Sequence, residues 1–215
     1  WRVLTMSDLR WGELATADLA GATTTEVRAR GKHLLHRFDS GWTLHSHLRM
    51  DGQWRVLHPG PATDRVQRRH DLRALLVTDD WSAAGLRLGM LDLVRTSQEG
   101  ALVGHLGPDV LGADWDAQRA AANLASHEGF VGEALLDQRV LAGVGTFWAS
   151  EALFVERILP WTPTAVLDQA QIRRLVATIH RLMDRGKKYA VPSSTGIPRP
   201  GEEGWVHGRS GRPCR

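Results

Sequence analysis

Three basic side chains surround one glycine in the segment Arg30-Gly31-Lys32-His33, and the flanking residues alternate as in a β-strand. A glycine lets the backbone come close to a partner. A lysine near a strand edge can bind a phosphate or support Schiff-base chemistry. We take Lys32 as the first candidate functional residue, although a solvated surface lysine is the commoner explanation of these residues alone.

Two glycines precede an amphipathic run that begins FWASEALF. Gly143 and Gly145 permit positive φ and close backbone approach, and Thr146 follows at a position that suits a helix N-cap. The free N–H groups of such a helix start attract anions, and on a basic protein that anion is a phosphate. An ordinary helical hairpin in a core explains the spacing equally well.

Histidines and a turn lie close together between residues 45 and 52. His45 and His47 alternate, so their side chains share one strand face. Such a pair could supply two metal ligands, but no third ligand is near in sequence, and we favour a polar pair. Asp51–Gly52 predicts a turn that places Met50 at a hairpin tip. Packing of Met50 inside a sandwich is the alternative.

The last residues carry two arginines and the single cysteine of the chain. Arg209 and Arg212 alternate with glycines, and Cys214 follows them. One thiolate cannot form a tetrahedral zinc site, and a single cysteine excludes an internal disulfide framework, which fits a reducing cytoplasm. Trp148 and Trp161 flank the amphipathic run, and we expect both to belong to the core.

The composition favours a protein with a localised basic groove. The 215 residues carry a formal net charge of only +3, although the isoelectric point is about 9.6. No apolar run approaches the roughly 20 residues that span a membrane, so we expect neither secretion nor membrane insertion. Because the chain starts at Trp1 and stops one residue after Cys214, we expect both ends to be incomplete.

The patterns along the chain predict an α+β fold. Residues 1–112 contain short alternating segments separated by Gly, Asp and Pro, which predicts a two-layer antiparallel β-sandwich. The polar stretch Pro59–His70 lacks periodicity, and we expect a mobile loop there. Residues 113–202 carry amphipathic helical patterns, and the longest predicted helix ends at Gly186.

Several segments resemble the formamidopyrimidine-DNA glycosylase / endonuclease VIII family. In chain order they are RGKHLL at Arg30–Leu35, HSHLRMDGQW at His45–Trp54, HLGPDVL at His105–Leu111, the helix–two-turn–helix stretch Gly132–Pro163, and WVHGRSGRPCR at Trp205–Arg215. The resemblance implies a catalytic sandwich, a helical DNA-binding domain in residues 113–202, and the start of a truncated zinc finger in residues 203–215. It also implies a monomer that binds damaged DNA, duplex or single-stranded, in the cytoplasm at the nucleoid.

The resemblance assigns roles to particular residues. Lys32 corresponds to a lysine that contacts damaged-site DNA and takes part in catalysis, and Met50 to a side chain that fills the space left by an extruded base. The residues that it implies for DNA binding are Arg30, Leu48, Arg49, Met50, Gly143, Gly145, Thr146, Arg209 and Arg212. Cys214 would be the first of four thiolate ligands of a structural Zn²⁺, given a fuller C-terminus. Catalysis itself needs no cofactor.

The family's chemistry uses a proline at the mature N-terminus. Its secondary amine attacks C1′ of the damaged nucleotide, displaces the base as an imine forms, and β-elimination then cuts the strand. A neighbouring glutamate serves as acid and base. This sequence contains no opening Met-Pro-Glu-Gly motif, so neither residue has a number here. A non-catalytic binder of damaged or single-stranded DNA is the alternative, and an RNA-binding protein is a third possibility.

The sequence departs from the family pattern at three places. Thr146 stands where the family has asparagine, and it lacks the amide donors of that residue. Gly132 stands where the formamidopyrimidine branch has a lysine associated with damaged purines. Leu88–Asp92 replaces that branch's arginine and phenylalanine wedge. The changes at Gly132 and at Leu88–Asp92 indicate the endonuclease VIII branch, which favours oxidised pyrimidines, and the wider sequence resembles actinobacterial members.

Overall fold

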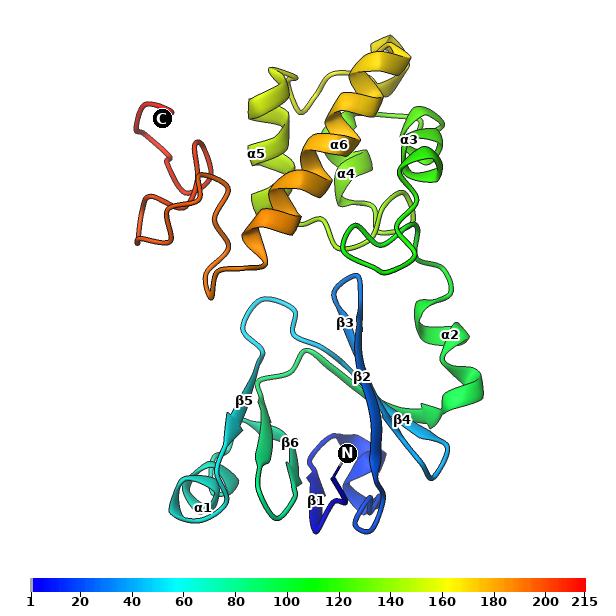
Figure 1. Ribbon diagram of the computed structural model, residues 1–215, viewed down its shortest axis with the longest axis vertical. Coiled ribbons are helices and arrows are strands. Elements are labelled where there is room, and N and C mark those ends of the chain that lie inside the picture. Colours follow the sequence, from blue (N-terminus) through cyan, green and yellow to red (C-terminus); the bar gives the residue numbers. More distant parts are fainter. Residues whose placement is uncertain (1) are drawn as a thin grey trace. The chain divides into compact units, whose positions relative to one another are not determined.

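The computed structural model describes residues 2–215, which form two compact units that meet at Gly104 and His105 in sequence (Figure 1). The N-terminal unit contains two four-stranded antiparallel sheets. One consists, in spatial order, of β1 (Met6–Leu9), β6 (Leu72–Val77), β7 (Ser82–Leu86) and β5 (Gln53–Leu57). The other consists of β2 (Thr24–Arg30), β3 (His33–Phe38), β4 (Trp42–His47) and β8 (Met90–Arg95).

The two sheets pack face to face. One buried apolar cluster takes Leu9 and Ala74 from the first sheet and Phe38 and Leu44 from the second. Alternate residues of a strand point to opposite faces, so each sheet offers one apolar face to this cluster. The α+β class and the predicted two-layer sandwich are thereby confirmed.

Short helices complete the N-terminal unit. They are η1 (Gly12–Thr16), α1 (Pro61–Gln67), η2 (Thr96–Gln98) and α2 (Gly100–Val103). The expectation of a loop over Pro59–His70 was wrong, because α1 lies inside it. Pro61 begins the helix, where its missing N–H costs nothing. Thr63 donates to the His58 carbonyl, and Val66 packs against a buried cluster. The sequence pattern of residues 59–70 does not indicate these contacts, because the partners lie outside the segment.

The C-terminal unit is helical. Its elements are α3 (Ala117–Ala125), α4 (Val131–Leu136), α5 (Thr146–Glu156), η3 (Thr164–Val166) and α6 (Gln169–Gly186). Helix α6 ends at Gly186, as predicted. There the ring of Trp148 would lie 2.2 Å from an added Cβ, so only glycine fits. Leu175, Ile179 and Leu182 of α6 are buried in the core of this unit.

The units divide a few residues before the predicted boundary at 112. Residues 105–112 pair with the helical unit, because Gly107 donates to the Gln138 carbonyl and Val110 to that of Ala142. After α6 the chain continues to Arg215 through turns without a regular element. No helix among residues 2–215 is long and apolar enough to cross a membrane.

Candidate functional site

The β2–β3 hairpin turn and the turn that leads from β4 to β5 lie side by side at one end of the β2-β3-β4-β8 sheet. The hairpin predicted around Met50 was wrong, because β4 and β5 belong to different sheets and do not pair. Antiparallel pairing sets His33, the first residue of β3, opposite His47, the last residue of β4. The turn before β3, which carries Lys32, therefore lies beside the turn after β4, which carries Met50. Gly31 makes the first turn with a φ of 58°, in the left-handed region that favours glycine. Sheet pairing thus brings together two segments that the sequence separates.

Lys32 is exposed at its turn. Nearby protein atoms still displace part of the water around its ammonium group, and this desolvation lowers the pKa of Lys32 below its ordinary value. A lower pKa increases the neutral fraction of the amine, the form that takes a proton. The charged form binds phosphate. Arg30 lies opposite His33 in the β2–β3 register, next to this turn.

The second turn holds an apolar side chain out in solvent. Met50 is 93% exposed, so the alternative that it packs inside the sandwich is excluded. Gly52 closes the turn by donating to the Leu48 carbonyl at 3.0 Å. Arg49 adopts a φ of 54°, and its side chain lies over Gly89, where an added Cβ would come within 2.1 Å of Arg49 Cγ. An exposed apolar side chain on a closed turn is suited to insertion between stacked nucleic-acid bases.

His45 is fully buried and hydrogen-bonded across the sheet. Its Nδ1 lies 2.8 Å from Oδ2 of Asp92 on β8, and its Nε2 lies 2.7 Å from Nδ1 of His33 on β3. Nothing in the sequence pattern places Asp92 beside His45. Pairing of β4 with β8 does so, since the two residues are register partners. Among residues 2–215, no group of three or more His, Cys, Asp or Glu side chains could hold a metal ion.

Gln138 organises the glycine turn before α5. Its Oε1 accepts the Gly143 N–H at 2.9 Å, and its Nε2 donates to the carbonyls of Leu136 and Val144. Gly143 has a φ of 100°, as its glycine suggested. These three hydrogen bonds hold the turn through which the chain enters α5.

The expected cap of α5 was wrong. Gly145, not Thr146, is the N-cap, because the Ala149 N–H donates to the Gly145 carbonyl. Gly145 has a φ of −120°, which any residue adopts, so the predicted positive φ applies to Gly143 alone. Thr146 is the exposed first residue of the helix. No side chain within residues 2–215 caps this helix start, and its first N–H groups point outward, as in any uncapped helix.

A buried carboxylate fastens the C-terminal segment to α5. Glu151 has no exposed surface, and it accepts three consecutive backbone N–H groups, those of Trp205–His207, at 2.7 to 2.9 Å. The hydroxyl of Ser194 donates to the same carboxylate. Such a set of donors stabilises a buried anion. In the sequence, Glu151 is one of two acidic residues near the helix, and nothing there indicates this partner.

This attachment brings two predicted DNA-binding arginines to the start of α5. Phe147 contacts the ring of His207 edge-on, with centroids 5.2 Å apart. Phe147, His207, Arg209 and Arg212 line a common cavity of about 420 Å³. The donors that the arginines offer and the first turn of α5 therefore belong to one local surface. Cys214 follows as an exposed free thiol, so the described residues do not fit a zinc ion.

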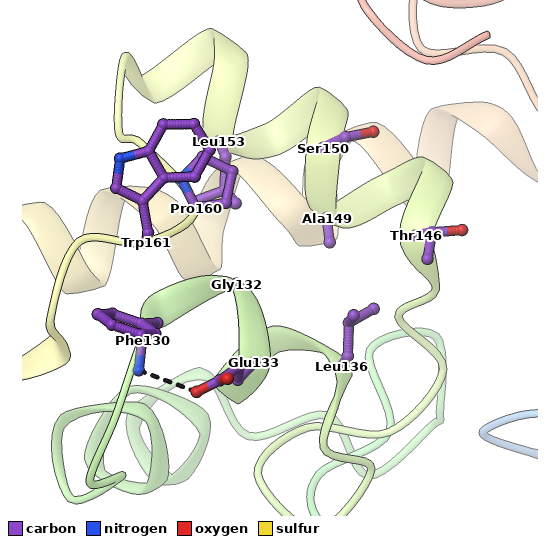
Figure 2. Close-up of a pocket in the computed structure, with 10 residues that line it drawn as sticks. All are labelled: Phe130, Gly132, Glu133, Leu136, Thr146, Ala149, Ser150, Leu153, Pro160 and Trp161. Carbon is purple, nitrogen blue, oxygen red and sulfur yellow. Dashed lines mark hydrogen bonds between the residues drawn. The ribbon is translucent and has the colours of Figure 1, made fainter.

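An apolar groove of about 400 Å³ lies between α4 and α5 (Figure 2). Phe130 and Trp161 lie toward one end of it, and Leu136 and Thr146 toward the other. Trp161 is 64% exposed, so its expected place in the core was wrong. Gly132 on α4 and Pro160 both line the groove and lie close together. A Cβ added at Gly132 would lie 2.9 Å from the Pro160 carbonyl oxygen. A larger residue at 132 would push α4 away from Pro160.

Comparison with known proteins accounts for both units. The family description "Formamidopyrimidine-DNA glycosylase N-terminal domain" matches residues 2–88, and "Formamidopyrimidine-DNA glycosylase H2TH domain" matches residues 106–195. Formamidopyrimidine DNA glycosylase of Lactococcus lactis, solved with DNA that contains an abasic site, aligns with a TM-score of 0.80. It is 22% identical, and the alignment covers 99% of this chain and 83% of that one.

Two relatives from actinobacteria are closer in sequence than that structure. "Probable endonuclease 8 2" of Streptomyces coelicolor is 46% identical over 99% of this chain and 76% of its own length. "DNA-(apurinic or apyrimidinic site) lyase Nei2" of Mycolicibacterium smegmatis is 40% identical over 100% of this chain and 82% of its own length. The chain therefore belongs to the formamidopyrimidine-DNA glycosylase / endonuclease VIII family.

Proposed function

We propose that this DNA glycosylase and abasic-site lyase excises oxidised bases, pyrimidines in preference to purines. The family supports the enzyme class, and relatives named endonuclease 8 and abasic-site lyase support the pair of activities. The observation that carries the proposal for this chain is the pairing of His33 with His47. It sets the turn with Lys32 beside the turn that presents Met50.

The described residues suit three tasks in that reaction. Met50, held out on a closed turn, occupies the space that an extruded base leaves in the stack. Lys32 binds the strand at the damaged nucleotide, and its lowered pKa lets it exchange protons during imine formation and elimination. The first turn of α5, with Arg209 and Arg212, binds phosphates. In the family the attacking amine is that of an N-terminal proline.

The preference for pyrimidines rests on two positions. Gly132 packs so closely on Pro160 that the lysine of the purine-directed branch does not fit without movement of α4. Leu88, in the segment that replaces that branch's wedge, is only 3% exposed and belongs to the sandwich core. Leu88 therefore cannot serve as a wedge, and Met50 carries that task.

Zinc remains a separate part of the proposal. Cys214 would supply one thiolate of a structural site, and three further ligands have to join it. The 215 residues contain no second cysteine. We therefore propose zinc for a chain that extends beyond Arg215, and no step of the reaction depends on it.

Borohydride trapping on an oligonucleotide with one abasic site tests the activity, with protein expressed from the complete gene. We expect a covalent adduct through an N-terminal proline, and strand cleavage without borohydride. Lys32→Ala should slow cleavage about a hundredfold or more, in line with the usual contribution of a positioned acid–base group. Lys188→Ala removes the same charge from an exposed site after α6 and serves as the matched control.

The outcomes separate the alternatives. Tight binding without an adduct or cleavage would overturn the lyase and leave a binder of damaged DNA. Equal cleavage by wild type and Lys32→Ala would remove Lys32 from the mechanism. Single-turnover excision from two duplexes, one with an oxidised pyrimidine and one with an oxidised purine, tests the lesion preference. A faster reaction on the purine contradicts it.

A further inference from the structure

Met50 differs from the other three methionines of the chain in its access to solvent. It is 93% exposed, whereas Met183 is 5% exposed in the helical core, and Met6 and Met90 are partly buried. A thioether is oxidised only when the oxidant reaches its sulfur atom, so exposure determines which methionine reacts first. Met50 is therefore the methionine that a dissolved oxidant reaches most easily.

The turn that carries Met50 is closed by contacts on both sides of this residue. Before it, the Arg49 N–H donates to Nδ1 of His47 at 2.9 Å. After it, the Gly52 N–H donates to the Leu48 carbonyl at 3.0 Å, and a Cβ added at Gly52 would lie 2.4 Å from that carbonyl oxygen. This tight backbone holds the thioether in solvent in the free protein.

Hydrogen peroxide is an oxidant that can react with such a sulfur. The sulfur attacks one oxygen of the peroxide, and the O–O bond breaks as the S–O bond forms. Sulfur loses two electrons in this step, and the second oxygen takes up the proton of the first and leaves as water. The product is methionine sulfoxide, which is polar where the thioether was apolar, and sulfoxide reductases convert it back to methionine.

We propose that Met50 is an oxidation site at which hydrogen peroxide lowers the rate of base excision from duplex DNA, and that reduction of the sulfoxide restores this rate. The inference rests on the proposed function, since it requires Met50 to fill the gap that an extruded base leaves. The faces of the two stacked bases beside that gap offer no hydrogen-bond donor to a sulfoxide oxygen. Burial of this oxygen between them therefore costs free energy that burial of a thioether does not.

Peptide mapping after a brief treatment with hydrogen peroxide identifies the oxidised residue. Trypsin cleaves after lysine and arginine, so each of the four methionines lies in a fragment of its own, and Met50 begins the fragment that ends at Arg55. We expect this fragment to gain an oxygen atom before the other three do. Oxidation of Met6, Met90 or Met183 ahead of Met50 would overturn the inference.

Single-turnover excision of an oxidised pyrimidine from a duplex connects the modification to activity. The peroxide is removed first, and dithiothreitol then reverses the oxidation of thiols such as the exposed Cys214. We expect the treated wild type to react about tenfold more slowly than before treatment. Methionine sulfoxide reductases for both sulfoxide epimers should restore the rate. Met50→Leu, which has no sulfur at this position, should keep its own untreated rate.

Met6→Leu is the matched control, because Met6 lies on β1 and is partly buried. We expect this variant to lose its rate on treatment as the wild type does. An equal loss in the wild type and in Met50→Leu would place the damage at another residue and overturn the inference. A loss in the wild type that the reductases do not reverse would overturn it as well.

Binding of uncleavable DNA separates this inference from the proposed function. A duplex with one tetrahydrofuran site should shield Met50 and slow its oxidation, whereas Met183 should react as in the free protein. If the sulfoxide at Met50 left the excision rate unchanged, the inference would fail and the glycosylase would stand. If the untreated protein excised nothing, the proposed function would fail. The affinity of the treated wild type for this duplex, compared with that of treated Met50→Leu, would then decide the inference.

Discussion

Burial changes what single side chains of the N-terminal unit do near neutral pH. Lys32 and His36 lie four residues apart along the β2–β3 hairpin. Partial desolvation lowers the pKa of the exposed Lys32, and deeper burial lowers that of His36. At Lys32 this increases the amount of neutral amine beside a proposed phosphate site. At His36, which contacts Thr24 at 2.8 Å and stacks on Phe38, it keeps a histidine neutral inside the sheet. The first effect concerns chemistry and the second stability.

The sign of the His36 effect follows from linkage. The folded protein keeps His36 neutral down to about pH 4, whereas the unfolded chain protonates it near pH 6.5. Between these values the unfolded state binds more protons, so the free energy of unfolding falls as the pH falls. From pH 6.5 to pH 4, the free energy of unfolding of His36→Gln should fall by roughly 1 to 3 kcal/mol less than that of the wild type. Urea unfolding across this range measures the difference, and parallel curves would contradict it.

Helix α5 organises the C-terminal unit at two places. At its start, Gln138 holds the glycine turn, so that the helix begins with free N–H groups toward solvent. In its middle, Glu151 binds the backbone of Trp205–His207 and so places the segment with Arg209 and Arg212. One helix therefore positions both of the surfaces that we propose for phosphate binding in this unit.

Replacing the buried carboxylate tests this arrangement. The amide of Glu151→Gln has one oxygen for three backbone N–H groups, and its own NH₂ group opposes at least one of them. We expect a loss of about 1 to 3 kcal/mol in stability. Hydrogen exchange should become faster at Trp205–His207 than elsewhere in the unit. Glu133→Gln, at an exposed residue with one long bond of 3.3 Å to the Phe130 N–H, is the control. Unchanged exchange at residues 205–207 would contradict the anchoring role.

The sequence predicted the molecule better at the scale of architecture than at the scale of contacts. Alternation and amphipathicity are local, and they predicted the sandwich, the helical unit and the end of α6. Asp92 and His45 form their contact across 47 residues of sequence. Glu151 binds backbone amides 54 to 56 residues away, and a contact with backbone amides does not depend on the types of the side chains there. Helix α1 was missed for the same reason, since Thr63 and Val66 anchor it through contacts outside the segment.

Salt dependence tests whether both units bind one DNA molecule. Removing one side chain that binds a phosphate should reduce the slope of log K against log salt by about 0.9. We expect this change for Lys32→Ala in the N-terminal unit and again for Arg212→Ala in the C-terminal unit. Because each of the two residues binds its own phosphate, the slope of the double variant should fall by about 1.8. Lys188→Ala controls for net charge. If the double variant had the same slope as one of the single variants, only one of the two residues would bind a phosphate. Contacts from one unit would then account for the DNA binding.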